Sequence, residues 1–131
     1  MTEKGRTLSS EPLTRDECLQ LLGGADLARI VMSVRALPAA LPTRISLSGD
    51  DHLILASSEE SVVVAMRRGD VISVQIDGLE PDGTIWSVMA SGIATAGAGD
   101  ETLRPAIREA IDQGATLLSL PLTVVSGQRS Y

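Results

Sequence analysis

The sequence is dominated by short runs of β-strand character that follow one another with only turns between them. In Thr43–Leu47, apolar residues alternate with polar ones, which is the period of two expected of a half-buried strand. Two pairs of runs flank turn sequences and are predicted to form hairpins: Thr43–Leu47 with His52–Ala56, and Val71–Ile76 with Thr84–Ala94. Because strands outnumber helices and mostly succeed each other directly, we expect a mainly β fold, an antiparallel barrel or sheet of about six strands.

Three short helices are predicted between these strands. A capping box, in which a hydroxyl and a carboxylate satisfy each other's backbone donors, begins the first helix at Thr14 and Glu17. The same pattern at Ser57 and Glu60 predicts a second helix that runs to about Arg68. The third has an apolar face at helical spacing, made by Leu103, Ile107, Ala110 and Ile111. Glycines are expected to end the three helices: Gly23-Gly24, Gly69 and Gly114. For Gly23-Gly24, at the end of the first helix, a left-handed cap conformation is expected.

Prolines and one glycine mark the places where we expect regular strands to be interrupted. Pro38 and Pro42 predict a loop or a sheet edge, because proline cannot donate to the hydrogen-bond ladder. Gly92 predicts a bulge or kink in the long strand that contains it. Pro121 predicts that the last strand, Leu118–Val125, lies at an edge or carries a bulge.

The length of 131 residues indicates one domain of ordinary size. A chain this long removes about two-thirds of its surface from water on folding, so it needs no disulfide or metal to hold it together. Residues 1–12 show no hydrophobic period and are predicted to form a flexible arm. Residues 13–131 then form the single domain, which ends in a tail at 126–131.

Composition excludes several classes of function. The net charge of −6 and an aromatic content of 2% argue against a nucleic-acid partner, which calls for clustered cations and stacking platforms. One cysteine and one histidine cannot build a zinc site, so no metal is expected. No apolar run approaches the length of about 20 residues that spans a bilayer, so no membrane association is expected. The polar N-terminus lacks a signal peptide, and a cytoplasmic location is the expectation.

No catalytic motif is present, and the two most reactive side chains have structural interpretations. Phosphate-binding loops, nucleophile elbows and metalloprotease motifs are all missing from the sequence. His52 follows a turn in an alternating run and is interpreted as a surface strand residue. Cys18 lies on the apolar face of the first helix and is interpreted as a small core residue. The catalytic residues therefore stay unassigned.

Three features keep a binding role open beside a structural one. Ser57, Ser58 and Ser61 lie at a strand-to-helix junction, where hydroxyls and free backbone N–H groups form a candidate phosphate cradle or cap the helix. Arg44 is a lone charge in an alternating run, which faces solvent or clamps an anion. Trp86 is interpreted first as a core or dimer-interface residue, and second as a ligand-stacking one.

An ordered series of segments runs from residue 13 to the C-terminus: Leu13–Leu19, Ala28–Val31, Leu37–Pro42, Leu53–Ser57, Ser61, Arg68–Val71, Gln75–Asp77, Trp86–Val88, Gly92 and Pro121–Arg129. In this order and spacing, the segments resemble the pyridoxamine 5'-phosphate oxidase-like family of flavin-binding split β-barrels, particularly its small bacterial members. The resemblance implies a six-stranded antiparallel Greek-key split β-barrel. It also implies a homodimer that binds a small molecule, usually FMN and in some branches F420, at the dimer interface. Some relatives bind haem, and some have no demonstrated cofactor.

The same resemblance implies roles for individual residues. Ser57 and Ser61 match the family's phosphate-binding hydroxyls, whereas Ala56 and Val62 stand where the family has cations. Ser87 matches a polar position near the flavin, and Arg129 a C-terminal arginine near cofactor or substrate.

The expected function is therefore flavin-nucleotide binding, in a small FMN- or F420-dependent oxidoreductase. With the cations at Ala56 and Val62 missing, the alternative is a non-redox relative that has lost flavin. Such a relative would bind another small ligand at the dimer cleft.

Overall fold

A computed structural model describes residues 10–97 and 103–131 of the chain. Its strands are β2 (Ser10–Pro12), β3 (Leu27–Val34), β4 (Leu37–Ser48), β5 (His52–Ser57), β6 (Val71–Leu79), β7 (Ile85–Ile93), β8 (Thr95–Ala96), β9 (Thr116–Pro121) and β10 (Val124–Ser130). Its helices are α1 (Arg15–Gly23), α2 (Glu60–Arg68) and α3 (Pro105–Asp112). The fold is mainly β, as the sequence predicts.

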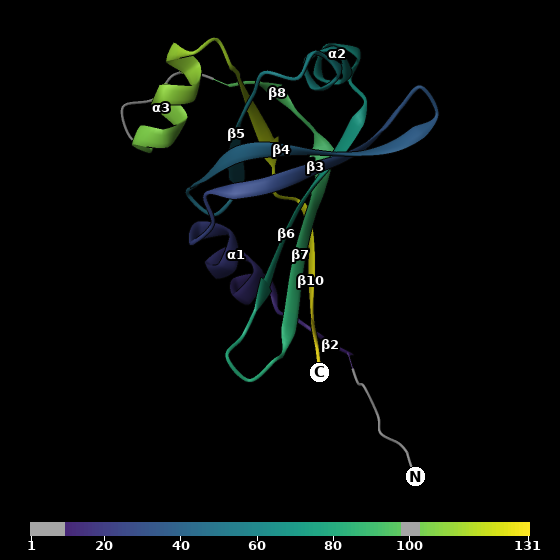
Figure 1. Ribbon diagram of the computed structural model, residues 1–131, viewed down its shortest axis with the longest axis vertical. Helices are drawn as coiled ribbons and strands as arrows, with labels where there is room; N and C mark the ends of the chain where they lie inside the picture. Colours follow the sequence, from purple (N-terminus) through teal and green to yellow (C-terminus); the bar gives the residue numbers. More distant parts are fainter. Residues whose placement is uncertain (1–9, 98–102) are drawn as a thin grey trace.

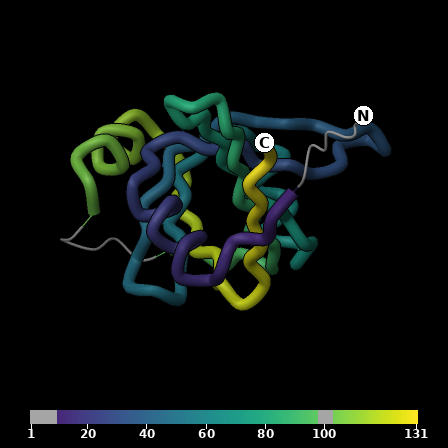
Figure 2. Tube along the Cα trace, turned by 90° about the horizontal axis from the view of Figure 1, so that it is seen from below, coloured from purple at the N-terminus to yellow at the C-terminus, as the bar shows by residue number. Residues whose placement is uncertain are grey.

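The strands form one antiparallel sheet in the order β2-β10-β7-β6-β3-β4-β5-β9-β8. This sheet has nine strands in the described ranges, so the expectation of six is wrong. Figure 2 shows the chain coiling around a central axis, yet within the described residues no strand pairing joins β2 to β8, the two ends of the sheet. Strands β7 and β9, which are not neighbours in the sheet, approach each other at Gly92, where a Cβ atom would lie 3.4 Å from Leu120 and Pro121.

The interior of the curled sheet is an aliphatic core. Inward positions repeat every second residue along the central strands, as in Ile72, Val74 and Ile76 of β6, all of them buried. Helix α1 covers one end of this core with Cys18 and Leu22, and α2 contributes Val62 and Ala65. Helix α1 lies against β7 and β10, and Figure 1 shows α2 and α3 at the upper end of the molecule, away from it.

The local signals at the helix ends are confirmed in part. The capping box of α1 is present, with both reciprocal bonds between Thr14 and Glu17. Gly24 ends α1 with a right-handed φ of −90°, so the left-handed cap expected there is wrong, whereas Gly69 ends α2 with a φ of 73°. The capping box expected at Ser57 is also wrong, because α2 begins at Glu60 with Glu59 as its N-cap and no side-chain cap.

Several predicted interruptions are instead regular strand. Pro38 and Pro42 lie within β4, where they pair with Ser33 and Arg29 of β3. Proline is tolerated there because β5 pairs with β4 only from Arg44 onward, so the earlier part of β4 is an edge in the described sheet, as expected. The bulge expected at Gly92 is wrong, because the register of β6 with β7 runs unbroken through it.

Strand pairing reaches both ends of the described chain. The run Leu118–Val125 is divided between β9 and β10, and the expected tail at 126–131 mostly belongs to β10. Of the predicted arm, Ser10–Pro12 forms β2 on the edge of β10, and residues 1–9 lie outside the described residues. No helix in the described part of the chain is long and apolar enough to span a membrane.

Candidate functional site

A cavity of about 530 Å³ lies where β3, β4, β5 and α3 meet, and we call it the Arg44 cavity. Arg44 reaches it from β4, directly opposite Ala56 in the register with β5. The hydroxyl of the neighbouring Thr43 donates a hydrogen bond of 3.1 Å to the carbonyl of Ala56. This bond ties the two strands together just where both of them line the cavity. The guanidinium is therefore carried on a rigid part of the sheet.

Ser57 and Ser58 form the wall of the Arg44 cavity next to α2. Ser57 is the last residue of β5 and is only 3% exposed, because it is still paired with Thr116 of β9. Its hydroxyl accepts a hydrogen bond of 3.2 Å from the backbone N–H of Glu59. Ser58 follows as an exposed residue, and α2 begins two residues later without a side-chain cap. Hydroxyls and backbone N–H groups of the kind that bind phosphate therefore line this wall.

The electrostatics of the Arg44 cavity are set by two opposite charges on its wall, Arg44 and Asp26. Asp26 forms an ion pair with Arg104, the residue that immediately precedes α3. The same guanidinium donates to the carbonyl of Ala25 at 3.1 Å and to that of Gly23. Because Arg104 neutralises the Asp26 carboxylate, Arg44 gives the wall an uncompensated positive charge.

The two positions where the resemblance places cations are apolar and buried in the structure. Ala56 is 5% exposed, and Val62 is fully buried within the core cluster under α2. A lysine at position 62 would have to enter the aliphatic core, where an unpaired charge is strongly unfavourable. A cation for the Arg44 cavity therefore has to come from Arg44 or from another molecule.

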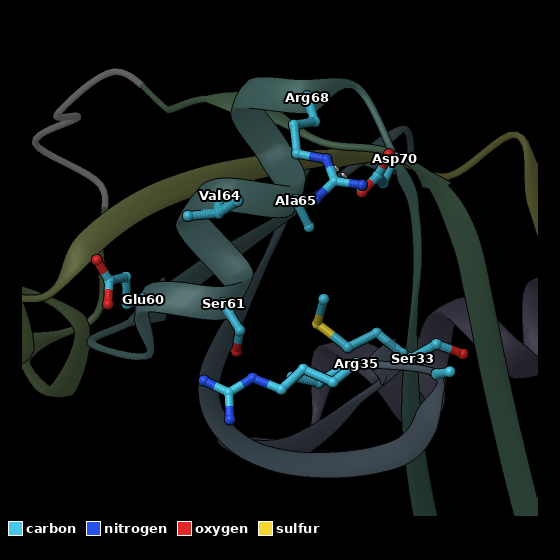
Figure 3. A pocket seen from close by; sticks show the side chains of 11 residues that line it. Ser33, Arg35, Glu60, Ser61, Val64, Ala65, Arg68 and Asp70 are labelled. Atoms are coloured by element: carbon cyan, nitrogen blue, oxygen red, sulfur yellow. Dashed lines mark ion pairs between the residues drawn. The ribbon is translucent and has the colours of Figure 1, made fainter.

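Ser61 lines a different cavity, on the other side of the first turn of α2. This second cavity, of about 610 Å³, lies between α2 and the tip of the β3–β4 hairpin, and we call it the Arg35 cavity. Figure 3 shows the Ser61 side chain pointing down into it, above the guanidinium of Arg35. The serines that the sequence groups together are thus divided between two neighbouring cavities.

Trp86, Ser87 and Arg129 lie on β7 and β10 and line neither of these cavities. The Trp86 indole packs over Gly78, where a Cβ atom would lie 2.1 Å from the ring. Arg129 pairs with Trp86 across the strands, and its guanidinium lies 3.8 Å from the carboxylate of Glu17 on α1. Ser87 points to the opposite face of β7 because neighbouring residues alternate along a strand.

Cys18 and His52 occupy the positions expected of structural residues. Cys18 is buried against Gly127 of β10, where a Cβ atom would lie 2.8 Å from its sulfur. Burial raises the pKa of the Cys18 thiol, which opposes formation of the nucleophilic thiolate. His52 is exposed, and its Nδ1 lies 3.1 Å from a carboxylate oxygen of Asp51. No group of three or more His, Cys, Asp or Glu residues in the described ranges could hold a metal ion.

The outer face of β6, β7 and β10 exposes apolar side chains next to one another. Val71 of β6 pairs with Ile93 of β7. Val124 of β10 pairs with Ser91, which lies two residues before Ile93 and therefore on the same face of β7. Their exposed fractions are 63%, 50% and 62% for Val71, Ile93 and Val124. Ser91 also forms a hydrogen bond of 2.7 Å with Ser73, so the polar groups between these apolar residues are satisfied within the sheet. We call this surface the outer sheet face.

Sequence reasoning missed several residues that shape the cavities. Asp26 and Gln113 line the Arg44 cavity, although they come from segments far apart in the chain. Arg35 lines the other cavity from a hairpin turn that contains no glycine to mark it. The β-rich sequence of β3 was a signal for this hairpin. Pro38 and Pro42, however, predicted a loop or a sheet edge where its second strand, β4, begins.

Comparisons with known protein sequences identify the family of this chain. A family profile described as pyridoxamine 5'-phosphate oxidase matches residues 14–127. The uncharacterized protein Rv0080 of Mycobacterium tuberculosis is 30% identical over 129 residues, with 89% of this chain and 83% of that protein covered. The chain therefore belongs to the pyridoxamine 5'-phosphate oxidase family, as the resemblance implies.

Two solved structures share the fold at lower sequence identity. An FAD-binding protein from Mesorhizobium loti superposes with a TM-score of 0.77 at 18% identity, covering 95% of this chain and 99% of that chain. The FAD-binding protein from Mycobacterium smegmatis gives a TM-score of 0.68 at 19% identity, with 92% and 98% covered. These two proteins share the mainly β antiparallel fold of this chain.

Proposed function

We propose that this protein binds a flavin nucleotide, with a phosphate of the nucleotide in the Arg44 cavity. The observation that carries the proposal is the meeting of Arg44, Ser57 and Ser58 in one cavity of about 530 Å³, in a chain of this family. Cavities of about 300–1,000 Å³ with a few convergent polar groups are typical of small-molecule sites. The descriptions of the M. loti and M. smegmatis proteins as FAD-binding support the same class of ligand.

The donors in the Arg44 cavity fit a phosphate. A phosphate monoester carries roughly two negative charges near neutral pH, and a guanidinium binds phosphate oxygens in a bidentate manner. Arg44 supplies that guanidinium, and the hydroxyls of Ser57 and Ser58 supply neutral donors. The positive end of the α2 dipole lies beside them and favours an anion. The Arg104–Asp26 ion pair removes the repulsion that a free carboxylate on the wall would exert.

A second copy of the chain completes the proposed site. The outer sheet face exposes Val71, Ile93 and Val124, and contiguous apolar surface of this kind is usually covered by a partner. We place the flavin ring in the cleft between two such copies. A bound flavin supplies hydride and electron transfer, and the protein holds and orients it. The function that follows is that of an FMN- or F420-dependent oxidoreductase. No residue of this chain is assigned as its acid or base.

A non-redox relative is the second candidate, and the buried apolar positions favour it. Ala56 and Val62 cannot supply the two cations of the family pattern, and Val62 is fully buried. The net charge of −6 also opposes a polyanionic ligand. In this alternative the Arg44 cavity takes a smaller anion in place of a flavin phosphate.

Flavin titration of the protein and of one variant separates these two candidates. FMN, FAD and F420 are titrated by fluorescence into the parent protein, Arg44→Gln and the control Arg67→Gln. Arg67 is an exposed α2 residue that lines neither cavity. A hydrogen bond to a charged group contributes about 1.5–3 kcal/mol, so Arg44→Gln is expected to weaken flavin binding by at least tenfold. No saturable binding of any of the three flavins to the parent would reject the proposal and favour the non-redox candidate.

The dimer is tested separately by sedimentation. The parent is expected to sediment at twice the chain mass of 13.7 kDa. Ile93→Asp places a charge in the middle of the apolar group on the outer sheet face and is expected to give monomers. His52→Asp introduces the same residue on the exposed part of β5 and serves as the control. A parent that stays monomeric at micromolar concentration would contradict the proposed cleft.

A further inference from the structure

The Arg35 cavity is larger than the Arg44 cavity and has a different construction. Its volume is about 610 Å³, within the usual range for small-molecule sites. One wall is the inner side of the β3–β4 hairpin with Met32 and Val34, and the other is α2 with Val64 and Ala65. Figure 3 shows α2 above the hairpin, with the side chains that line the cavity between them.

The turn at the tip of the hairpin is in an unfavourable conformation. Val34 pairs with Leu37, so Arg35 and Ala36 form a two-residue connection. Both have left-handed backbones, with φ of 53° and 65°. Turns of this kind prefer Asn-Gly or Gly-Gly, because a side chain at positive φ is strained. Strain of this kind collects at functional sites, where another requirement fixes the residue.

The strained turn presents a free guanidinium to the cavity. In the described part of the chain Arg35 has no hydrogen-bond or ion-pair partner. Figure 3 shows its side chain lying along the cavity floor, with the guanidinium below Ser61. The Ser61 hydroxyl on the α2 wall and the guanidinium on the floor therefore face each other at the same end of the cavity.

The other charged groups of the Arg35 cavity do not cancel this positive charge. Arg68 and Asp70 form an ion pair of 3.4 Å, so their charges offset each other. The Glu60 carboxylate points away from the cavity in Figure 3. Arg35 thus supplies the uncompensated charge, and the adaptable side chain of Met32 lies with Val34, Val64 and Ala65 on the apolar walls.

We propose that the Arg35 cavity is a second ligand site, which binds an organic anion. Arg35 and the Ser61 hydroxyl hold the carboxylate or phosphate head, and the apolar walls hold an aliphatic body. The inference does not rest on flavin binding, because none of its residues lines the Arg44 cavity. A strained arginine in place of glycine is explained if the guanidinium is needed there.

The test uses three probes of equal chain length on flavin-free protein: octanoate, octyl phosphate and the neutral octanamide. Binding is followed by amide chemical shifts in two-dimensional NMR, and the titrations separate a carboxylate ligand from a phosphate ligand. We expect saturable shifts at Ser33, Arg35 and Ser61 with one or both anions, and binding at least tenfold weaker for octanamide. Equal binding of octanamide, or no saturable shift at these residues with either anion, would overturn the proposal.

Two glycine variants of the turn separate binding from folding. Arg35→Gly removes the guanidinium and Ala36→Gly does not, but both relieve one left-handed side chain. Both are expected to keep or raise the Tm. Arg35→Gly is expected to weaken binding of the preferred anion at least tenfold, while Ala36→Gly leaves it within twofold of the parent. An Arg35→Gly protein that is folded and binds like the parent would overturn the role of Arg35.

Discussion

The first turns of α1 and α2 satisfy their backbone donors in different ways. At α1 the N–H of Glu17 donates to the Thr14 hydroxyl at 3.1 Å, and the N–H of Thr14 donates to the Glu17 carboxylate at 2.9 Å. At α2 no side chain caps the helix. The first turn of α1 is thus closed by its own side chains, whereas that of α2 lies between two cavities with hydroxyls and arginines around it. The comparison teaches that one helix start is closed by its own side chains, whereas the other has no side-chain cap, as the two proposed ligand sites require.

The largest expected effect concerns the interior side of α2. Val62→Lys places an unpaired ammonium among fully buried aliphatic residues and should lower the free energy of unfolding by about 3–5 kcal/mol. Val64→Lys, two residues on and 37% exposed, should change it by less than about 0.5 kcal/mol. Urea denaturation of both variants measures the difference. A Val62→Lys protein as stable as the parent would show that the family cation can be restored at this position.

Alanine substitutions at the two helix starts should separate stability from binding. Thr14→Ala removes the cap of α1 and should cost about 1 kcal/mol of stability without changing flavin affinity. Ser58→Ala removes an exposed hydroxyl of the Arg44 cavity and should leave stability unchanged while weakening flavin binding. Denaturation and flavin titration are carried out on each variant. If Thr14→Ala weakens flavin binding as much as Ser58→Ala, the two helix starts do not differ in role.

The smallest expected effect is the acid sensitivity of the α1 cap. Hydrogen bonds from the backbone and hydroxyl of Thr14, together with Arg129, lower the pKa of the Glu17 carboxyl below its ordinary value of 4.5. A lowered pKa in the folded state stabilises the fold above pH 4.5, and that contribution is lost as pH falls through the lowered pKa. Glu17→Gln should flatten this part of the stability profile between pH 5 and pH 3. An unchanged profile in that range would mean that the cap does not depend on the charge.

The sequence signal was the same at both helix starts, yet it was right at only one of them. Thr14 is exposed and follows a short edge strand, so its hydroxyl is free to turn back onto the helix. Ser57 is held in β5 by its pairing with Thr116, and the helix begins only after Glu59. The start of α2 is thus set by the pairing of β5 with β9, and a local sequence pattern carries no information about such a long-range pairing.

The same distinction explains the rest of the fold and the site. The hairpin of Thr43–Leu47 with His52–Ala56 is confirmed, because its alternation and turn are local in sequence. The pairing of Pro38 with Ser33 depends on the absence of a strand beyond that part of β4 in the described sheet. The neutralisation of Asp26 depends on Arg104, which lies 78 residues away in the chain. Such contacts are set by the curl of the sheet.

The central claim is that two separate ligand sites flank the first turn of α2, and amide shift mapping tests it most directly. The flavin that binds most tightly is added to labelled protein, and the octyl anion is added to a second sample. Flavin is expected to shift Arg44, Ser57 and Ser58, and the octyl anion to shift Ser33, Arg35 and Ser61. Flavin shifts centred on Arg35 rather than Arg44, or displacement of flavin by the octyl anion, would contradict the account.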